Sequence, residues 1–494
     1  MKIAFEKKPM KSDTLIVFAA DGAKLSEAAK ALDRKTGGSL SRAVKAEGFK
    51  GKSGETLVVA GPTGIPQKYL VLLGAGTPDA LQPRDLEKIG SQLVALLNNK
   101  KSTAAALMLD VFKKGTDQAA GSIALGGLLN SYRFDKYLTT QPKDKKPTLK
   151  TLQLIVDNPP AARKVFADKQ KIVDGVFLTR DLVSEVPNVL YPESFATIIK
   201  RELSGLRVKV TVLDDKQIRK LGMGALEAVG KGSDRKHRLV TMEYRGGKTS
   251  QKPVAFVGKG VTFDTGGISL KPGPGMEDMK WDMAGAGAVT GLMKVLAARR
   301  AKVNAIGIVA LAENMPSGGA CRPGDIVKTM SGQTVEILNT DAEGRLILCD
   351  ALWYAQQKFK PTHIVDLATL TGAVIIALGH EYGGLFANDD SLAKHLVQAG
   401  DAVGEALWQM PLNDAWDKAI DSPAADIKNI ASSRDAGSAI GAHFLKRFIQ
   451  PGVKWAHLDI AGVAWSNKDR VGVPKGASAF GVRLLDRFVA DHWE

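Results

Sequence analysis

The sequence contains little cysteine and no long apolar run, and each shortage excludes a class of protein. Only two of its 494 residues are cysteines, Cys321 and Cys349, and they form no C-x-x-C pair. We therefore expect two buried thiols, and neither a disulfide framework nor a zinc knuckle. The longest apolar stretches fall well short of the roughly 18 residues that a membrane span requires. Because no secretory signal is recognisable either, we expect a soluble, cytoplasmic protein without a membrane partner.

Several common hydrolase motifs are also absent. The sequence has no H-E-x-x-H or H-x-x-E-H, which excludes a zincin-type protease, and no G-x-S-x-G nucleophile elbow. The G-x-x-x-x-G-K-[ST] loop that cradles phosphates is missing as well. The pair Gly74 and Gly76 after an apolar run is only a weak nucleotide-loop candidate, because the third glycine of that motif is lacking.

Positive charge is in excess and is unevenly distributed. The chain carries 68 Lys and Arg against 52 Asp and Glu, for a formal charge of +16. Residues 1–170 hold 28 basic and 16 acidic residues, so most of the excess lies in the first third. Such a region is either an electrostatic footprint for DNA or a solvated surface. The short basic run at 143–150 has no aromatic residue for base stacking, and charge alone leaves both interpretations open.

The pattern of apolar runs predicts two α/β domains. A single core is unusual at this length, and short apolar runs alternate with helical periodicities along the chain. We expect a basic α/β domain at 1–157, a linker helix at 158–185, and a catalytic domain at 186–494 with a central, largely parallel sheet flanked by helices. In the first region the pattern predicts strands 15–20, 56–60, 69–73 and 104–109 and helices 25–32 and 85–97. Beyond it the pattern predicts strands 208–213, 238–244, 254–257, 305–310, 363–367 and 454–459 and helices 161–183, 283–298 and 342–357.

Four carboxylates stand near the ends of predicted strands or the starts of predicted helices in the second domain. They are Asp264, Asp282, Asp341 and Glu343. Ligands collect at the carboxyl ends of parallel strands, and carboxylates gathered there repel one another unless cations neutralise them. Oxygen-rich ligation suits Mg, Mn or Zn, and four carboxylates are enough for a two-metal site with a bridging group.

A purely structural interpretation of the same residues is open at this point. Asp282 and Asp341 can cap helices, and Glu343 can favour the dipole of a first helical turn. Lys259 and Lys271, which lie in a nearby glycine-rich turn and just after it, can be surface lysines. Clustered carboxylates also occur in two-metal phosphatases and nucleases.

Two longer motifs of the second domain carry a resemblance to a known family. They are the octapeptide N-T-D-A-E-G-R-L at 339–346 and the segment V-G-K-G-V-T-F-D-T-G-G-I-S-L-K-P at 257–272. The first is similar to the signature, and the second to the metal loop, of the leucyl aminopeptidase (cytosol aminopeptidase) family. The likeness covers about residues 175–494, whereas the first domain resembles the family's macro-like domain only in size and α/β pattern. Further blocks match in the family's order at 313–316, 322–325, 366–372 and 457–462.

The resemblance implies roles for individual residues. Lys259, Asp264, Asp282 and Glu343 would bind the tighter-held metal ion. Asp264, Asp341 and Glu343 would bind the more exchangeable one, so that Asp264 and Glu343 bridge two divalent ions. These are expected to be Mn or Zn, with Mg possible. Lys259 can ligate only as a neutral amine, which requires the neighbouring dications to depress its pKa.

The resemblance also implies a mechanism. A hydroxide bridging the two metals would attack the scissile carbonyl, while the free α-amino group of the peptide binds one metal. Lys271 would stabilise the tetrahedral oxyanion, and Arg345 would hold a bicarbonate ion as general base. The pocket would favour Leu and other apolar first residues. The implied substrate-binding residues are Met279, Asn339, Thr369, Leu370, Gly372 and Ala461.

Partners follow from the same resemblance. The substrates would be short peptides with a free N-terminus, and the chain would assemble as a homohexamer. Some members of the family bind DNA, which keeps an additional DNA-binding role of the basic N-terminal region as the alternative function. Ala464 stands where some relatives carry Met in the pocket, so the exact side-chain preference is left open.

Overall fold

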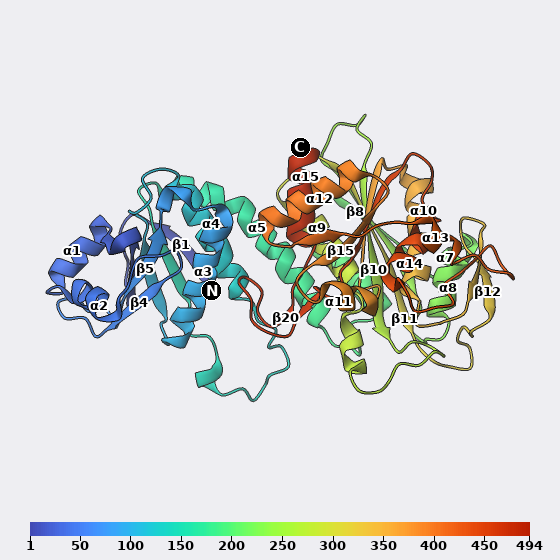
Figure 1. The fold of residues 1–494 in the computed structure, drawn as a ribbon, viewed down its shortest axis with the longest axis horizontal. Coiled ribbons are helices and arrows are strands. Elements are labelled where there is room, and N and C mark those ends of the chain that lie inside the picture. The colour runs from blue at the N-terminus through green and yellow to red at the C-terminus, as the bar shows by residue number, and fades with distance from the viewer. The chain divides into compact units, whose positions relative to one another are not determined.

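The computed structural model describes all residues, 1–494, and divides them into two compact units. Unit 1 comprises Met1–Val173 with Asp469–Pro474, and unit 2 comprises Asp174–Lys468 with Lys475–Glu494. The division falls inside a long helix, α5 (Pro159–Ser184), at the place where a linker helix is expected (Figure 1). The grouping of Asp469–Pro474 with unit 1 has no signal in the sequence pattern. None of the helices combines the length and the apolar character needed to cross a bilayer.

Unit 1 is built on a mostly parallel sheet in the order β1-β7-β6-β2-β5-β4. Neighbouring strands on this path are parallel except β4 and β5, and β3 pairs antiparallel with β2. The strands are β1 (Lys2–Glu6), β2 (Thr14–Ala20), β3 (Lys24–Leu25), β4 (Thr56–Ala60), β5 (Tyr69–Gly76), β6 (Ala104–Met108) and β7 (Thr151–Ile155). The helices are α1 (Glu27–Lys35), α2 (Ser39–Glu47), α3 (Pro83–Asn99) and α4 (Thr116–Asn130), with short 3-10 turns at Asp21–Ala23, Pro78–Ala80 and Lys143–Lys145.

The four strands and two helices predicted in the first region are confirmed as β2, β4, β5, β6, α1 and α3. Helix α1 begins later than predicted, because Leu25 belongs to β3 and the Ser26 hydroxyl accepts the Ala29 N–H as the N-cap. The pattern does not predict β1, β7, α2 or α4. Helix α4 is apolar on nearly all sides and is buried, so it lacks the amphipathic period by which a surface helix is recognised.

The weak nucleotide-loop candidate has a structural explanation. A Cβ atom on Gly74 would lie 2.0 Å from the Lys52 carbonyl oxygen, so this position requires glycine for backbone packing. Gly76 adopts a φ of +59° at the end of β5. Both glycines are accounted for by the loop they pack against, and no ligand is needed to explain them.

Unit 2 contains an eight-stranded sheet in the order β16-β15-β18-β14-β10-β11-β9-β8. The central strands β18, β14, β10 and β11 are parallel. Antiparallel pairing begins at β15 on one side and at β9 on the other. The strands are β8 (Val208–Leu213), β9 (Arg238–Arg245), β10 (Val254–Asp264), β11 (Asn304–Asn314), β14 (His363–Ala368), β15 (Gly383–Ala387), β16 (Leu407–Gln409) and β18 (Lys454–Asp459).

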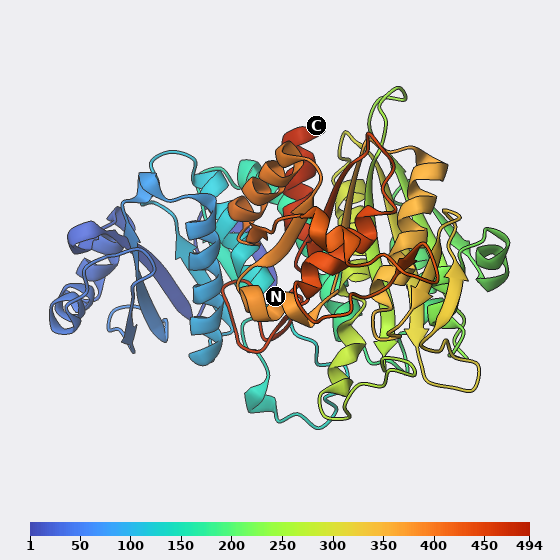
Figure 2. The same ribbon diagram turned by 45° about the vertical axis from the view of Figure 1, so that its right-hand side comes forward.

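Smaller elements and helices surround this sheet. A three-stranded sheet joins β12 (Asp325–Lys328), β13 (Thr334–Ile337) and β17 (Ile427–Lys428), and a two-stranded one joins β19 (Trp465–Ser466) and β20 (Gly476–Ala477). Helices α9, α12 and α15 lie on one face and α8, α10 and α14 on the other (Figures 1 and 2). The helices are α6 (Pro192–Glu202), α7 (Asp215–Lys220), α8 (Gly224–Gly230), α9 (Ala284–Ala298), α10 (Gly344–Phe359), α11 (Gly372–Leu378), α12 (Asp390–Val403), α13 (Asp414–Lys418), α14 (Gly437–Lys446) and α15 (Val482–His492), and η4 (Met276–Trp281) is a 3-10 helix.

The strands and helices predicted for this region are confirmed, but β10 and β11 are longer than expected. The prediction that a glycine-rich turn follows residue 257 is therefore wrong, because the strand continues through Gly258, Lys259 and Gly260 to Asp264. The reason is that Lys259 is only 3% exposed, so its charge does not mark a surface turn. The pattern rule fails here because a buried charge is rare unless it is paired.

Close backbone packing explains the glycines of this region. A Cβ atom on Gly258 would lie 2.6 Å from the Gly285 carbonyl oxygen, and one on Gly285 would lie 2.0 Å from the Leu367 carbonyl oxygen. Helix α9 therefore lies directly on the backbones of β10 and β14. This contact fixes the start of α9, and with it Asp282, beside Lys259.

Candidate active site

The predicted site residues come together at the carboxyl ends of the parallel strands of unit 2. Asp264 is the last residue of β10 and pairs with Asn314, the last residue of β11. Asp341 and Glu343 lie in the segment between β13 and α10, and Asp282 lies between η4 and α9. Three separated segments thus supply four carboxylates to one edge of the sheet, as parallel topology favours.

Lys259 lies inside β10 and is surrounded by oxygen atoms. Its Nζ is 2.8 Å from Oδ1 of Asp282, 2.8 Å from Oε1 of Glu343 and 2.8 Å from the Thr369 carbonyl oxygen. Asp282 Oδ1 also accepts the Thr369 hydroxyl at 2.6 Å. Because Lys259, Asp282 and Glu343 are all nearly inaccessible to water, these contacts replace the hydration of the three charges.

Lys271 forms a second ion-pair group nearer the surface. Its Nζ lies 2.8 Å from Oδ2 of Asp264 and also contacts Oδ1 of Asp341. The other oxygen of Asp264 accepts hydrogen bonds from the Gly266 N–H at 2.9 Å and from Nδ2 of Asn314 at 2.8 Å. The interpretation of Lys259 and Lys271 as surface lysines is therefore wrong.

The capping alternative is also wrong for Asp282, and Glu343 does not lie in the first turn of a helix as its structural alternative requires. Met283 is the N-cap residue of α9, and no side chain caps that helix, since Asp282 points to Lys259 instead. Glu343 is the N-cap residue of α10, but its carboxylate makes no capping hydrogen bond and contacts Lys259. These carboxylates face one another and the two lysines, which is the arrangement of a binding site.

The clustered charges shift the pKa values of the acids. Burial, and next the negative charge of Asp264, raise the pKa of Glu343 to about 8. Burial raises the pKa of Asp282 to about 6, although Lys259 opposes the rise. Burial and Asp264 likewise raise the pKa of Asp341. Burial and mutual repulsion thus favour the protonated form of these acids more than the two lysines favour the carboxylates.

The two lysines respond in the opposite direction to their burial. Burial disfavours the ammonium of Lys259, but Asp282, Glu343 and Asp264 together raise its pKa well above the ordinary value. Lys271 shows the same balance, with Asp264 as the largest opposing charge, and its pKa is also raised. Without further cations at the site both lysines are therefore charged.

The donor set fits divalent metal ions. Asp264, Asp341 and Glu343 each offer an oxygen, and these three atoms lie within 4.8 Å of one another. Oδ2 of Asp282 is buried and has no hydrogen-bond partner, which is costly for a carboxylate oxygen unless a cation binds it. Four carboxylates against two ammonium groups leave room for added positive charge, and oxygen ligands suit Mg, Mn and Zn.

Arg345 lies in the first turn of α10 and is only 6% exposed. Its Nη1 donates to the Asn429 carbonyl oxygen at 2.8 Å, whereas its Nε is buried and has no partner. Burial lowers its pKa to about 10, although Glu343 and Asp459 oppose that change. A buried guanidinium with an unused donor fits a small planar anion.

Of the residues expected to bind substrate, Thr369, Leu370 and Ala461 lie on loops, and Gly372 begins α11. A buried carboxylate, Asp459, ties two of these loops together, since its Oδ1 accepts the N–H groups of Leu370 and Ala461 at 3.1 and 3.3 Å. Its other oxygen accepts the Thr371 hydroxyl at 2.6 Å, directly before Gly372. The sequence reasoning missed this role of Asp459, because nothing in local spacing shows which loops a carboxylate joins.

Two further expected residues hold neighbouring segments. Oδ1 of Asn339 accepts the Asp341 N–H at 2.8 Å, and the Met279 carbonyl oxygen accepts the Asp282 N–H at 3.3 Å. Met279 itself lies half-buried in η4. Asn339 therefore contacts the backbone N–H of Asp341, and Met279 contacts that of Asp282.

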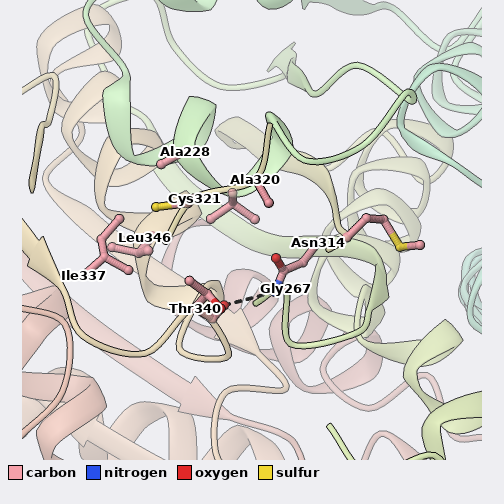
Figure 3. Close-up of a pocket in the computed structure, with 10 residues that line it drawn as sticks. Ala228, Gly267, Asn314, Ala320, Cys321, Ile337, Thr340 and Leu346 are labelled. Carbon is pink, nitrogen blue, oxygen red and sulfur yellow. Dashed lines mark hydrogen bonds between the residues drawn. The ribbon is translucent and has the colours of Figure 1, made fainter. Parts of the chain in front are cut away.

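A small cavity adjoins the cluster (Figure 3). Asn314 and Thr340 line it, and Nδ2 of Asn314 donates to the Thr340 carbonyl oxygen at 3.0 Å as well as to Asp264. Cys321 lies on the more apolar side of the cavity, where burial raises the pKa of its thiol to about 11. Cys321 and Cys349 are both free and buried, as the sequence predicts.

Comparisons with known proteins find relatives of this chain over most of its length. Residues 177–486 match the profile of the cytosol aminopeptidase family, catalytic domain, and residues 16–141 match that of the family's N-terminal domain. A "Probable cytosol aminopeptidase" of Caulobacter vibrioides is 49% identical over 483 residues, which is 97% of this chain and 96% of that protein. One of Chelativorans sp. is 50% identical over 499 residues, covering 100% and 99%.

This chain belongs to the cytosol aminopeptidase family. Two solved structures share its fold. A mutant tomato leucine aminopeptidase has a TM-score of 0.87 at 32% identity, covering 100% of this chain and 97% of that one. The bottromycin maturation enzyme BotP in complex with Mn has a TM-score of 0.84 at 30% identity, covering 98% and 100%. The protein is thus a peptidase of a metal-dependent family that removes N-terminal residues, and the resemblance carried by the signature octapeptide is confirmed.

Replacing Lys259 by Met in the metal-free protein is expected to lower the free energy of unfolding by about 3–5 kcal/mol, because it leaves Asp282 and Glu343 as uncompensated buried charges. The loss should grow from pH 5 to pH 8, since these acids, with pKa values of about 6 and 8, become charged over that range. Urea denaturation in the presence of a chelator, at several pH values, measures this free energy of unfolding. Lys271→Met, at a more exposed site, is the control and should cost less. Equal, small losses in both variants would contradict the charge balance described above.

Proposed function

We propose that this protein cleaves the first residue from short peptides with a free N-terminus at a two-metal site, preferring Leu and other apolar residues. The observation that carries the proposal is the convergence of Asp264, Asp341 and Glu343 within 4.8 Å, next to Asp282 with its unpartnered oxygen. The names of the relatives add the reaction class, and the word cytosol in them supports intracellular peptide turnover in the cytoplasm.

The ligands divide into two sets that share two carboxylates. Lys259, Asp264, Asp282 and Glu343 would hold one divalent ion, and Asp264, Asp341 and Glu343 the other. When bound, the two ions supply Lewis-acid activation of water and of the scissile carbonyl. The related BotP structure is a complex with Mn, which makes Mn a good candidate, and Zn and Mg fit the same ligands. Lys259 joins its set as a neutral amine, since an ammonium has no free electron pair.

Two residues of the chain complete the chemistry. The side chain of Lys271 is 22% exposed and its ammonium contacts Asp264 and Asp341, where it can donate to the developing oxyanion of the substrate. Arg345 would hold a bicarbonate ion through its free Nε, which supplies a general base that no side chain of the cluster provides.

The first side chain of the substrate would lie among the loops that Asp459 ties together. Thr369, Leu370 and Ala461 belong to these loops, Gly372 begins α11, and Met279 and Asn339 belong to the segments of Asp282 and Asp341. Met is a flexible, polarizable lining that accommodates apolar side chains of different shapes. The resemblance expects Met in some members of the family where Ala464 stands, and the smaller side chain of Ala464, 2% exposed, would leave room for long side chains such as Leu and Met.

Hydrolysis of leucine p-nitroanilide tests the reaction class. Activity should disappear on chelation and return with Mn or Zn. Glu343→Gln should stay below about 1% of wild type, since even changes to residues that only support metal ligands cost 10–100-fold. Substrates with Glu as first residue should be cleaved more slowly than those with Leu. Equal rates would contradict the apolar preference. Phosphate release from model esters without peptide cleavage would overturn the reaction class.

Arg345→Met should lower kcat by about 10²–10⁴, the usual contribution of a general base. In carbonate-depleted buffer the wild-type rate should rise when bicarbonate is added, and the rate of the variant should not respond. Arg345→Lys keeps the charge but not the planar fork, so it is the matched variant for anion binding. A bicarbonate response of the same size in Arg345→Met would contradict the assignment.

We also propose a homohexamer, which exposed apolar side chains support. Ile376 on α11 is 90% exposed. Close by in sequence, Tyr382 packs against Trp408 at 5.7 Å while both remain at least 40% exposed. Such groups of exposed apolar side chains are typical of interaction surfaces.

Sedimentation equilibrium should give six times the chain mass of 52.6 kDa. Ile376→Glu should shift the protein to smaller species, because it places a charge in the interface. Leu138→Glu, at a 52% exposed position of unit 1, is the control and should leave the mass unchanged. A monomeric wild type would refute the assembly.

DNA binding by the basic N-terminal region stays a prediction from its charge and from the resemblance to a family of which some members bind DNA. Neither the name of the family nor the names of the relatives mention nucleic acid. Peptide cleavage is therefore the function we favour.

A further inference from the structure

We propose that Asn429 is a positioning residue that holds the segment of Asp341 and Glu343 and the guanidinium of Arg345 in one fixed arrangement. The inference rests on the proposed function of these three residues. Asn429 lies directly after β17 and is fully buried. It is 86 positions away in sequence from the nearest of the acids it serves, Glu343.

The side chain of Asn429 binds the backbone of the segment that carries the acids. Its Oδ1 accepts the N–H groups of Leu338 at 2.9 Å and Asn339 at 3.3 Å. Its Nδ2 donates to the carbonyl oxygens of Asn339 at 2.7 Å and Ala342 at 3.4 Å. One amide therefore spans the segment from the residue after β13 to the residue before Glu343.

The backbone of Asn429 links the same residue to two other parts of the site. Its carbonyl oxygen accepts Nη1 of Arg345 at 2.8 Å, and its N–H donates to the Glu336 carbonyl oxygen at 3.0 Å. The second contact extends the parallel pairing of β13 with β17, in which Glu336 lies opposite Lys428. Asn429 thus binds both the acids' segment and Arg345, while its own backbone is held by the pairing of β13 with β17.

An amide is the chemical group that suits this place. The carbonyl oxygen can accept two hydrogen bonds and the NH₂ group can donate two, so all four are used. An aspartate would keep the accepted N–H bonds but would turn an oxygen toward the carbonyl oxygens of Asn339 and Ala342. An alanine would leave the N–H groups of Leu338 and Asn339 and the Ala342 carbonyl oxygen without the partner that Asn429 provides, and the Asn339 carbonyl oxygen would keep only the Ala342 N–H at 3.2 Å. A buried segment tolerates such losses poorly.

The test measures metal affinity apart from catalysis, in the full-length protein. The Kd of Mn²⁺ is determined by competition with a chromophoric chelator, and kcat and KM are determined on leucine p-nitroanilide. Asn429→Ala and the isosteric Asn429→Asp should both raise the Kd by about 10–100-fold, as the loss of hydrogen bonds that orient metal ligands does. Both should lower kcat more than they change KM at saturating Mn²⁺, because residue 429, whose backbone carbonyl oxygen binds Arg345, is then no longer tied by its side chain to the segment of Asp341 and Glu343.

Asn304 provides a matched control in the same unit. It is a buried Asn at the opposite end of β11, and its side chain also bridges backbone groups, accepting from Gly247 and donating to Lys248 and Gln251. Asn304→Ala should lower the thermal stability while the Kd of Mn²⁺ stays within about twofold of wild type, well below the effect of losing a support for a metal ligand.

The outcomes separate the two levels of the proposal. Wild-type Kd and kcat in the folded Asn429 variants would overturn the positioning role while the proposed function stands. Equal weakening of Mn²⁺ binding by Asn304→Ala would also overturn it, since general destabilisation would then explain the loss. A wild-type protein that binds no Mn²⁺ would overturn both proposals. If Asn429→Ala does not fold, Asn429→Asp, which keeps the volume of the side chain, decides the question.

Discussion

The ammonium group of Lys259 lies inside a strand, 2.8 Å from oxygen atoms of both Asp282 and Glu343, in a place that water does not reach. Burying a single charge there would be prohibitive, and burying the carboxylates of Asp264, Asp282 and Glu343 without cations would be more so. The sheet edge can therefore exist only with charges of both signs at hydrogen-bond distance. Every segment that supplies one of these groups has to be fixed to within a few tenths of an ångström.

Backbone-to-backbone packing supplies that precision. A Cβ atom on Gly344 would lie 2.6 Å from Cε of Lys259, and Gly258 and Gly285 allow α9 to lie directly on β10. Side chains between these elements would have left each acid free to shift with its own helix. Because glycine has no side chain to separate these elements, the start of α9 and the start of α10 both lie close to Lys259. Asp282 and Glu343, which stand at these two helix starts, are therefore held beside it.

The sequence predicts the groups of the site far better than the connections between them. Asp264, Asp341 and Glu343 could be recognised because strand ends and helix starts are local features, and the octapeptide gave an independent resemblance. The roles of Asn429 and Asp459 could not, because each acts on segments about 90 residues away and no periodicity reports such a contact. The predicted strand 254–257 is shorter than β10 for a related reason. A pattern of apolar residues cannot distinguish a buried, paired lysine from a surface lysine.

The same charge balance constrains how metal ions could enter. In the metal-free site Lys259 is an ammonium, held by the acids that raise its pKa, whereas on the proposed assignment it is a neutral ligand. On that assignment, metal binding would release the proton of Lys259. It would also release any proton on Glu343, whose pKa of about 8 means that the carboxyl group is partly protonated at neutral pH. The lysine thus acts as an internal substitute for a cation, which keeps the acids together until a metal ion replaces its charge. On the proposed assignment, this explains why a metal site built mainly from carboxylates would contain a buried lysine.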